Sequence, residues 1–441
     1  MQYATVFHPT RKLKGTIHLP PSKSISNRLL VLQHLYKNIA IENLSQSSDT
    51  LVLQAALAQI SQRNEAELCT IDVADCGTAM RFLAAVLAIT PGQFLLTGTE
   101  RMQQRPIAPL VDALRQLGAD IEYTKNEGFP PLLIRGKKLE GGKVSIDGSL
   151  SSQYASALMM IGPALAKGLG LQLEGLVTSL PYIQMTAKLM QQCDLDITFD
   201  ANLNNFTIFT KFVIPNSQFV IAPDWSSASY WYCMAALSED AEIYLPGLRL
   251  DSLQGDAVCA KIFAKLGVET TQSEKGIAII KSLGFDFTQP DINGSPNYQT
   301  TKSPNQPFSY SFQACPDLVP AVAVACFGLD IPAELHGIGN IKHKESDRGK
   351  AIAEELGKLE VGSWNLEDNS LKYIPKNELN TPHSPLPALL LQTHSDHRLA
   401  MAFAALGILF PVEVENPNVV EKSYPNFWED VKRMGFDTST T

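Results

Sequence analysis

One pattern recurs six times along the 441-residue chain and limits the folds open to it. A polar or Gly/Ser/Pro cap opens a helix rich in Ala and Leu, a short strand-like run with a turn follows, and a second, more charged helix comes next. The six caps are Ser22, Gly77, Ser151, Ser226, Pro316 and Asp396. Their spacing runs from 55 residues (77 minus 22) to 90 residues (316 minus 226), which is too long for a solenoid repeat. The pattern instead predicts six two-helix, multi-strand units.

The six units divide into two groups of three, which predicts two domains, over residues 21–221 and 222–441. A short N-terminal strand, residues 3–8, could return to either group. Residues 288–309, rich in Pro, Asn, Ser and Gln, are predicted to be a surface insertion. The strands after the first helices are predicted at residues 41–44, 94–98, 171–175, 242–247, 333–337 and 412–416. Glycine stops after second helices are predicted at Gly118, Gly267, Gly357 and Gly435.

The stretch from Pro20 to Arg28 carries the first candidate site. Two prolines stop the preceding segment, and Ser22 is placed to cap a helix over residues 23–36. The buried side of this helix is predicted to hold Ile25, Leu29, Leu32 and Tyr36. Another face holds Ser24, Asn27 and Arg28, with Lys23 in the first turn. There the helix dipole favours an anion, so the stretch is either a phosphate site or a capped helix with solvated basic residues.

Composition argues against binding to nucleic acid or membranes and against a secreted or membrane-spanning protein. The net charge is -9, and no run of Lys or Arg reaches five residues, so nucleic acid and anionic membranes are not expected as partners. Seven cysteines without a C-x-x-C pair argue against a disulfide framework and indicate a reducing cytoplasm. Residues 1–15 hold no apolar core of a signal peptide, and the longest apolar run, residues 318–329, is too short to span a bilayer.

Cations gather at the loop ends of the predicted units. Taken singly each would be a surface charge, but their recurrence at equivalent ends predicts a site for substrates that bear phosphates and carboxylates. The eight cations are Lys23, Arg28, Arg81, Arg105, Lys344, Arg348, Arg398 and Lys422. Polar residues accompany them at Ser151, Ser152, Gln153, Ser179 and Tyr182.

Two acids stand among these cations. Asp317 follows Pro316 at the start of an apolar helix, where it could simply be a first-turn carboxylate. Glu345 could form a surface pair with Arg348 at i, i+3. The functional alternative is a base and an acid held beside bound anions.

Other chemical signatures fail. The chain has no G-x-x-x-x-G-K-[ST] loop for nucleotide phosphates, and Gly168-Leu169-Gly170 lacks the third glycine of a dinucleotide fingerprint. His394 and His397 have no evident further metal ligands, and neither Cys76 nor Cys315 has a nearby histidine base. We therefore expect no metal and no organic cofactor.

The ordered motifs resemble those of the 5-enolpyruvylshikimate-3-phosphate synthase family, from Ser22-Lys23-Ser24 to Lys422 along nearly the whole chain. The resemblance rests on Gly77 to Arg81, Arg105-Pro106-Ile107, Ser151-Ser152-Gln153, Ser179 to Tyr182, Pro316-Asp317, Asn340 to Arg348 and Asp396-His397-Arg398. It implies an α/β fold of six βαβαββ units, three per domain, as an inside-out α/β barrel. It also implies crossovers near Pro20 and Ala222, with residues 1–20 joining residues 222–441.

The resemblance implies a transferase of aromatic amino-acid biosynthesis. It moves the carboxyvinyl group of phosphoenolpyruvate to the 5-hydroxyl of shikimate 3-phosphate, without a cofactor. We also expect a cytoplasmic monomer. Shikimate 3-phosphate would contact Lys23, Ser24, Arg28, Ser151, Ser152, Gln153, Ser179, Tyr182, Asp317, Asn340 and Lys344. Phosphoenolpyruvate would contact Lys23, Gly77, Arg105, Gln153, Arg348, Arg398 and Lys422. Asp317 would be the base, with Glu345 or Lys23 as the acid.

This sequence departs from the family pattern in three places. Asp75-Cys76 stands where Asn-Ala is usual, Phe82 replaces a frequent proline, and Leu180 replaces a frequent lysine. Asp75 adds negative charge near the expected phosphoenolpyruvate site, and Gly77 keeps the small residue that a glyphosate-sensitive site needs.

Two alternatives belong to other classes of function. The sister class, UDP-N-acetylglucosamine enolpyruvyl transferase, has the same architecture but lacks the Lys-Ser-x-Ser-x-Arg run. It typically carries a reactive cysteine in the loop that here reads Gln103-Gln104-Arg105. A non-catalytic anion-binding protein would not need the paired acid and base.

The cations of the expected site come from both domains. We therefore expect shikimate 3-phosphate to neutralise them and so to close an open form of the protein, with the two crossovers as the hinge.

Overall fold

The computed structural model describes residues 2–200, 205–209, 217–281, 307–376 and 388–440. It divides into two compact units. The N-terminal unit comprises Pro21–Ala222 and Leu253–Gly255, and the C-terminal unit comprises Met1–Pro20, Pro223–Ser252 and Asp256–Thr441. The chain thus passes between units after Pro20 and after Ala222. The inclusion of Leu253–Gly255 in the N-terminal unit was not anticipated from the sequence.

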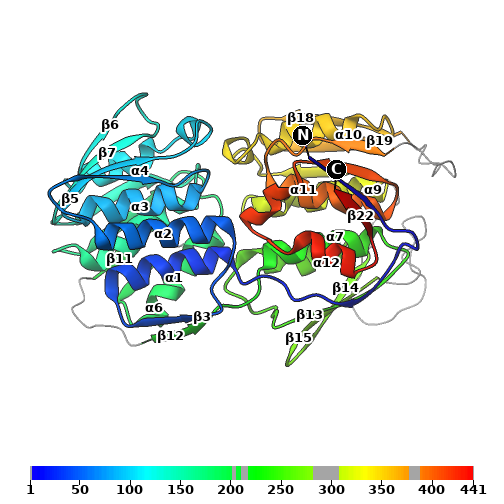
Figure 1. Cartoon of the computed structure of the whole chain (residues 1–441), viewed down its shortest axis with the longest axis horizontal. Helices are drawn as coiled ribbons and strands as arrows, with labels where there is room; N and C mark the ends of the chain where they lie inside the picture. Colours follow the sequence, from blue (N-terminus) through cyan, green and yellow to red (C-terminus); the bar gives the residue numbers. More distant parts are fainter. Residues whose placement is uncertain (1, 201–204, 210–216, 282–306, 377–387, 441) are drawn as a thin grey trace. The chain divides into compact units, whose positions relative to one another are not determined.

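Helices lie in the middle of the N-terminal unit, with small sheets at its outside (Figure 1). The central helices α1 (Lys23–Tyr36), α3 (Gly77–Ile89) and α5 (Ser152–Ile161) pack against one another and are mostly buried. The bounds and the Ser22 cap of α1 are those predicted, and its predicted buried side is buried except at Tyr36, which is half-buried. The remaining helices are α2 (Ser48–Gln62), α4 (Ala108–Gln116) and α6 (Leu180–Gln192), with short 3-10 turns η1 (Met102–Gln104) and η2 (Gly162–Ala164).

The sheets of this unit follow the repeated order of the predicted βαβαββ units. One sheet has the order β4-β5-β7-β6 and the next β10-β11-β9-β8, each with one parallel pair. The first comprises β4 (Leu68–Asp72), β5 (Gly92–Thr97), β6 (Asp120–Tyr123) and β7 (Leu132–Gly136). The second comprises β8 (Gly142–Asp147), β9 (Leu169–Glu174), β10 (Ile197–Phe199) and β11 (Asn205–Ile208). Among the described residues the third holds a parallel pair, β3 (Ile39–Glu42) and β12 (Ser217–Val220).

The C-terminal unit repeats this plan around α7 (Trp225–Leu237), α9 (Val319–Gly328) and α11 (His397–Ala404), which pack together and are almost fully buried. The outer helices are α8 (Cys259–Ala264), α10 (Arg348–Gly357) and α12 (Phe427–Arg433). The 3-10 turns are η3 (Gly255–Val258), η4 (Pro316–Leu318), η5 (Ile341–His343), η6 (Ala405–Ile408) and η7 (Pro417–Lys422). One sheet, β16-β17-β19-β18, is continuous in sequence: β16 (Phe308–Ser311), β17 (Ala333–His336), β18 (Gly362–Glu367) and β19 (Ser370–Pro375).

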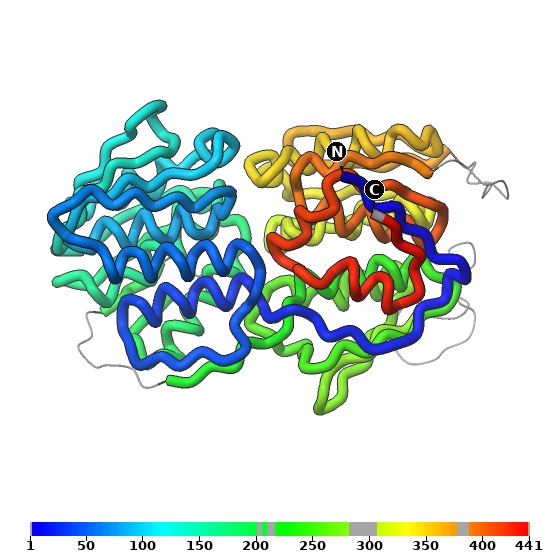
Figure 2. Tube along the Cα trace, in the orientation of Figure 1, coloured from blue at the N-terminus to red at the C-terminus, as the bar shows by residue number. Residues whose placement is uncertain are grey.

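The N-terminal segment completes the other two sheets of this unit, as the tube trace shows (Figure 2). β2 (Lys12–Thr16) runs parallel to β13 (Asp240–Pro246), beside β15 (Gly276–Lys281) and β14 (Val268–Ser273). β1 (Tyr3–Phe7) lies between β21 (Val412–Glu415) and β22 (Asp437–Thr440), with β20 (Leu389–Leu391) at the edge. The described residues form six sheets, one for each of the six predicted units, but two sheets include a strand from residues 3–16.

Some of the predicted caps and glycine stops were wrong. Cys76 rather than Gly77 caps α3, and Asp224 rather than Ser226 caps α7, because their side chains accept from backbone N–H groups of the first turn. Gly118, Gly267 and Gly435 have positive φ, as a stop after a helix requires, but Gly357 is the last helical residue and Glu360 takes the left-handed conformation instead. The predicted insertion, residues 288–309, lies mostly outside the described residues, and its last two residues already belong to β16. Among the described residues, none of the helices combines the length and apolar character that crossing a membrane requires.

Candidate active site

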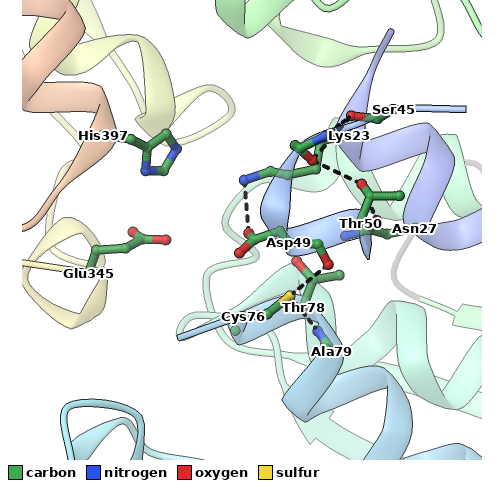
Figure 3. Close-up of polar contacts among 12 residues, drawn as sticks. Lys23, Asn27, Ser45, Asp49, Thr50, Cys76, Thr78, Ala79, Glu345 and His397 are labelled. Carbon is green, nitrogen blue, oxygen red and sulfur yellow. Dashed lines mark hydrogen bonds and ion pairs between the residues drawn. The ribbon is translucent and has the colours of Figure 1, made fainter. Parts of the chain in front are cut away.

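In the N-terminal unit, Lys23 lies in the first turn of α1. Its ammonium pairs with Asp49 in the first turn of α2, and Nζ lies 3.0 Å from Oδ2 (Figure 3). The two side chains are 13% and 7% exposed, so this ion pair is largely removed from water. Lys23 was predicted from its motif, whereas Asp49 was not, because after Ser47-Ser48 it has the position of an ordinary first-turn acid.

Arg28 is buried one turn further along α1, so the prediction of solvated basic residues on this face is wrong for it. Its guanidinium donates to Thr186 Oγ1 (2.6 Å) and Ser156 Oγ (3.2 Å), and to the backbone oxygens of Ser24 and Tyr182. Burial lowers the pKa of Arg28 to about 10. Among the described residues these partners include no carboxylate, so the positive charge is held by neutral groups.

Gly77 begins α3 directly against Arg105. A Cβ added at Gly77 would lie 2.7 Å from Arg105 Nη1, so only glycine lets the guanidinium lie there. Arg105 is 7% exposed, and its Nε is buried without a hydrogen-bond partner among the described residues. Arg81 and Tyr154 both donate to the Pro106 carbonyl, at 3.0 and 2.6 Å, and so fix the loop that carries Arg105.

The first turn of α5 contacts that of α3. Ser151 caps α5 by accepting from the backbone N–H of Gln153, and Gln153 Nε2 donates to Thr78 Oγ1 at 3.1 Å. Ser152 is buried beside them. The helix N-termini of this unit, which favour anions, therefore meet around the predicted residues.

The start of α6 adds two more predicted residues. Ser179 precedes the helix with φ 54°, in the left-handed region that non-glycine residues rarely adopt. Tyr182 is buried in the first turn, and the Arg28 guanidinium lies over its ring at 6.0 Å from the centroid. Tyr182 thus contacts Arg28, and Ser179 accepts from the Tyr182 backbone N–H at 2.9 Å.

In the C-terminal unit, the buried guanidinium of Arg348 contacts carboxylates from separate segments. Nη1 lies 2.8 Å from Asp317, Nη2 lies 2.9 Å from Glu345, and Nε lies 2.7 Å from Asp396. Burial opposes its charge, but Asp396, Glu345 and Asp317 raise the pKa of Arg348 above its usual value. The predicted Glu345–Arg348 pair exists, but as a buried contact rather than a surface one.

Asp317 lies in η4, just before α9, and is surrounded by cations. Besides Arg348, Arg398 Nη2 lies 2.8 Å from Oδ2, and Lys344 Nζ lies 3.6 Å from Oδ1. Burial favours the neutral acid, but Arg398, Lys344 and Arg348 outweigh it and hold the pKa of Asp317 well below its usual range. This carboxylate is therefore ionised at neutral pH.

The remaining predicted residues lie at other points of the same unit. Burial lowers the pKa of Lys344, although Asp317 partly opposes this. Asn340 is 6% exposed, and its Oδ1 has no hydrogen-bond partner among the described residues. Lys422 ends η7 and is half-buried.

From the sequence, Asp396 was predicted to cap a helix and was part of a family motif, but it was given no role in the site. It does cap α11, accepting from the backbone N–H of Arg398 at 2.9 Å, but it also holds Arg348 and accepts from Ser346. It is fully buried. The signal in the sequence was its place in the family motif Asp396-His397-Arg398, directly before two basic side chains.

The structure places each residue that departs from the family pattern. Phe82 is buried with its ring 5.4 Å from the Arg28 guanidinium carbon. The Cys76 thiol caps α3 by accepting from Ala79 N at 3.3 Å. Asp75 is exposed and accepts a hydrogen bond from Thr99 Oγ1. Leu180 is the first residue of α6.

The histidines and cysteines considered from sequence have ordinary surroundings. His394 Nε2 lies 3.2 Å from buried Glu355, and His397 Nδ1 lies 3.7 Å from Asp396. All seven cysteines lie within the described ranges and are free thiols. Among the described residues no group of three or more His, Cys, Asp or Glu side chains is placed to hold a metal ion.

Comparison with known proteins decides the family. The family model described as EPSP synthase (3-phosphoshikimate 1-carboxyvinyltransferase) matches residues 7–431. The protein belongs to the EPSP synthase family. A 3-phosphoshikimate 1-carboxyvinyltransferase of Bacteroides fragilis is 41% identical over 428 residues, covering 96% of both chains. One of Shewanella pealeana is 34% identical over 454 residues, covering 97% of this chain and 98% of its own.

Solved structures show the same fold. An EPSP synthase from Acinetobacter baumannii superimposes with a TM-score of 0.74 at 18% identity, covering 100% of both chains. The enolpyruvyl transferase NikO from Streptomyces tendae gives 0.71 at 15% identity, covering 100% of this chain and 99% of its own. The predicted family, α/β fold class and enzyme class are confirmed.

Proposed function

We propose that this EPSP synthase family member transfers the carboxyvinyl group of phosphoenolpyruvate to the 5-hydroxyl of shikimate 3-phosphate. The products are 5-enolpyruvylshikimate 3-phosphate and phosphate, on the route to chorismate and the aromatic amino acids. The observation that best supports the proposal is the Asp317 carboxylate held among Arg348, Arg398 and Lys344. A base set among cations suits a proton transfer between two anionic substrates.

In this proposal the N-terminal unit binds the phosphate group of shikimate 3-phosphate. Arg28 supplies a positive charge that neutral groups hold, and the first turn of α5 supplies hydroxyls and N–H groups. Asn340 has a buried acceptor suited to a ring hydroxyl. The proposed residues are Lys23, Ser24, Arg28, Ser151, Ser152, Gln153, Ser179, Tyr182, Asp317, Asn340 and Lys344.

Phosphoenolpyruvate is proposed to bind arginines of both units. Arg105 has a buried Nε available for an anion, and planar guanidinium groups match carboxylate and phosphate oxygens. The proposed residues are Lys23, Gly77, Arg105, Gln153, Arg348, Arg398 and Lys422.

The same cations control the basicity of Asp317. Arg348 and Arg398 stabilise its ionised form in the unliganded protein, which makes it a weak base. When the anionic groups of phosphoenolpyruvate compete for these guanidinium groups, the carboxylate loses part of that stabilisation and its pKa rises. Binding of the second substrate thus prepares Asp317 to accept a proton.

The proposed reaction proceeds by addition and then elimination. Asp317 takes the proton of the 5-hydroxyl of shikimate 3-phosphate while the oxygen of that hydroxyl bonds to C2 of phosphoenolpyruvate. Glu345 or Lys23 gives a proton to the methylene carbon. In the resulting tetrahedral intermediate, loss of a methyl proton and cleavage of the C2–O bond to phosphate give the product. The arginines and lysines offset the charge that builds up on the phosphate.

We further propose that the protein acts as a cytoplasmic monomer with two domains, without metal, cofactor, nucleic acid or membrane. The net charge of -9 and the free cysteines support this setting.

Phosphate release from the purified protein tests the reaction. We expect release with phosphoenolpyruvate and shikimate 3-phosphate together and none when either is omitted. Release with a UDP-sugar instead of the shikimate would point to the sister enzyme class, and no release with either pair would point to a binding protein.

Variants of the two acids test the proposed roles. We expect Asp317→Ala and Glu345→Gln each to lower kcat at least about 100-fold, in the range of general acid–base catalysis. Glu354→Gln, an exposed acid of α10 paired with Lys350, is the control and should keep wild-type kcat. Near-normal kcat in both site variants would contradict the mechanism.

A further inference from the structure

Asp49 is a buried carboxylate for which the proposed reaction has no role. Its side chain is 7% exposed, and its ion pair with Lys23 is the contact between charged groups that joins the first turns of α1 and α2. Asp49 lies where the dipole of α2 stabilises a negative charge. A partly buried ion pair contributes little net stability, because desolvation offsets the attraction, so stability alone does not explain this pair.

Neutral hydrogen bonds already hold α1 and α2 together. Thr50 Oγ1 donates to Asn27 Oδ1 at 2.8 Å, and the Ser45 backbone N–H donates to Ser26 Oγ at 3.1 Å. These contacts place the Asp49 backbone without help from its carboxylate. Figure 3 shows the two sets of contacts beside one another.

A further contact ties the start of α2 to α3. The Cys76 thiol, which caps α3, donates to the backbone oxygen of Asp49 at 3.4 Å. The carboxylate of Asp49 is therefore fixed relative to Gly77, the next residue of α3, against which Arg105 lies.

Lys23 differs from these groups because its ammonium ends a flexible four-carbon chain. A lysine loses about 2 kcal/mol of rotamer entropy when its side chain is held in one position. An anchored carboxylate 3.0 Å away supplies that restraint before any ligand binds.

We propose that Asp49 is a positioning residue that orients the Lys23 ammonium toward phosphoenolpyruvate. The inference rests on the proposed function, in which Lys23 contacts phosphoenolpyruvate and is a candidate proton donor. Asp49 itself touches no substrate in this scheme and acts through Lys23.

A double-mutant cycle separates this role from a structural one. We expect Asp49→Asn to lower kcat/KM for phosphoenolpyruvate roughly 10- to 100-fold, the cost of a misplaced catalytic group. Added to Lys23→Met, the same change should lower kcat/KM by less than about threefold, because the group it positions is already gone. Equal effects in both backgrounds would overturn the proposal.

Two further variants sharpen the test. Asp49→Glu keeps the charge and should recover part of the activity that Asp49→Asn loses. Thr50→Val removes the neutral contact to Asn27 and should lower the melting temperature while keeping kcat/KM within about threefold of wild type. A Thr50→Val defect as large as that of Asp49→Asn would mean that loosened α1–α2 packing, not Lys23, is responsible.

Lysine ammonium NMR spectra test the pair without any turnover. We expect a Lys23 ammonium signal that is protected from water exchange in the wild type, lost in Asp49→Asn and assigned by its absence in Lys23→Met. If the wild type releases no phosphate with the shikimate pair, the proposed function fails and this role fails with it. If the wild type is active and Asp49→Asn is equally active or keeps the signal, the inference alone fails.

Discussion

Two buried arginines hold their charges in opposite ways. Arg28 is surrounded by hydroxyls, carbonyls and aromatic rings, and burial lowers its pKa to about 10. Arg348 contacts Asp317, Glu345 and Asp396, which raise its pKa. The first leaves positive charge available for an anion, whereas the second uses its charge to organise acids. The sequence alone treats both simply as cations at loop ends.

Gly77→Ala should move Arg105. The new Cβ would meet the guanidinium at 2.7 Å, and a flexible side chain can yield, so the fold survives while the cation shifts. We expect KM for phosphoenolpyruvate to rise about tenfold, the dissociation constant of shikimate 3-phosphate to change less than about threefold, and the melting temperature to hold. Steady-state kinetics and calorimetry measure these. Gly357→Ala, with nothing within 4 Å of its Cβ, is the control, and an unchanged KM in Gly77→Ala would refute the placement of Arg105.

Phe82→Leu should weaken binding of shikimate 3-phosphate. It removes the ring that lies 5.4 Å from the Arg28 guanidinium carbon, a contact of about 0.5–2 kcal/mol. We expect the dissociation constant, measured by calorimetry, to rise about 2- to 30-fold.

The control for this prediction is Phe94→Leu. Phe94 makes the same kind of contact with Arg63 at 5.2 Å in the same unit, away from the predicted residues. It should lower stability but leave binding unchanged. Equal binding losses in the two variants would mean that the effect is general loosening of the unit.

Site residues could be predicted from the sequence where a motif contains them. The side chains that they contact could not be predicted. Lys23, Gly77 and Asp317 could be selected from local patterns, but Asp49 and Asp396 could not, because a first-turn acid or a cap has a sufficient local explanation. Their second role depends on side chains 26 and 48 residues away. Only the packing of separate helices creates it.

At the scale of elements, the first turns of helices recur as the places where polar and charged side chains of different helices meet. The starts of α1, α2, α3 and α5 touch in one unit, and those of α9, α10 and α11 touch in the other. Element positions were predicted closely for this reason: caps such as Ser22, Ser151 and Asp396 mark them in the sequence. The borrowed strands β1 and β2 were less predictable, since short N-terminal runs give no sign of their distant partners.

Asp396→Asn should destabilise the C-terminal unit. It removes a fully buried charge that holds Arg348 while keeping a residue able to cap α11. Breaking such a pair costs about 3–5 kcal/mol. Tryptophan fluorescence during urea unfolding reports on this unit alone, since all four tryptophans, Trp225, Trp231, Trp364 and Trp428, belong to it. Glu354→Gln in α10 should cost less than about 1 kcal/mol, and a similar cost in both variants would contradict the role of Asp396.

At the scale of the whole molecule, the proposed site draws cations from both units. We expect shikimate 3-phosphate to lower the radius of gyration in small-angle scattering, toward the value of about 22 Å for a compact chain of this length. The negative charge of the phosphate group would offset repulsion among those cations. The two points where the chain crosses between units, after Pro20 and after Ala222, would act as hinges. Shikimate without the phosphate should have a smaller effect. An unchanged radius with saturating ligand would exclude this response.

The place of β1 also bears on how the protein is made. Phe7 pairs with Asp437, which leaves the ribosome 430 residues (437 minus 7) later. At roughly 10 residues per second, that is a delay of about 40 s. The N-terminal unit can fold during this time, because all of it lies within residues 21–255, whereas β1 must wait for β22. β1 is therefore made long before the strand that completes its sheet, and a chaperone that shields the unpaired strand would act over that interval.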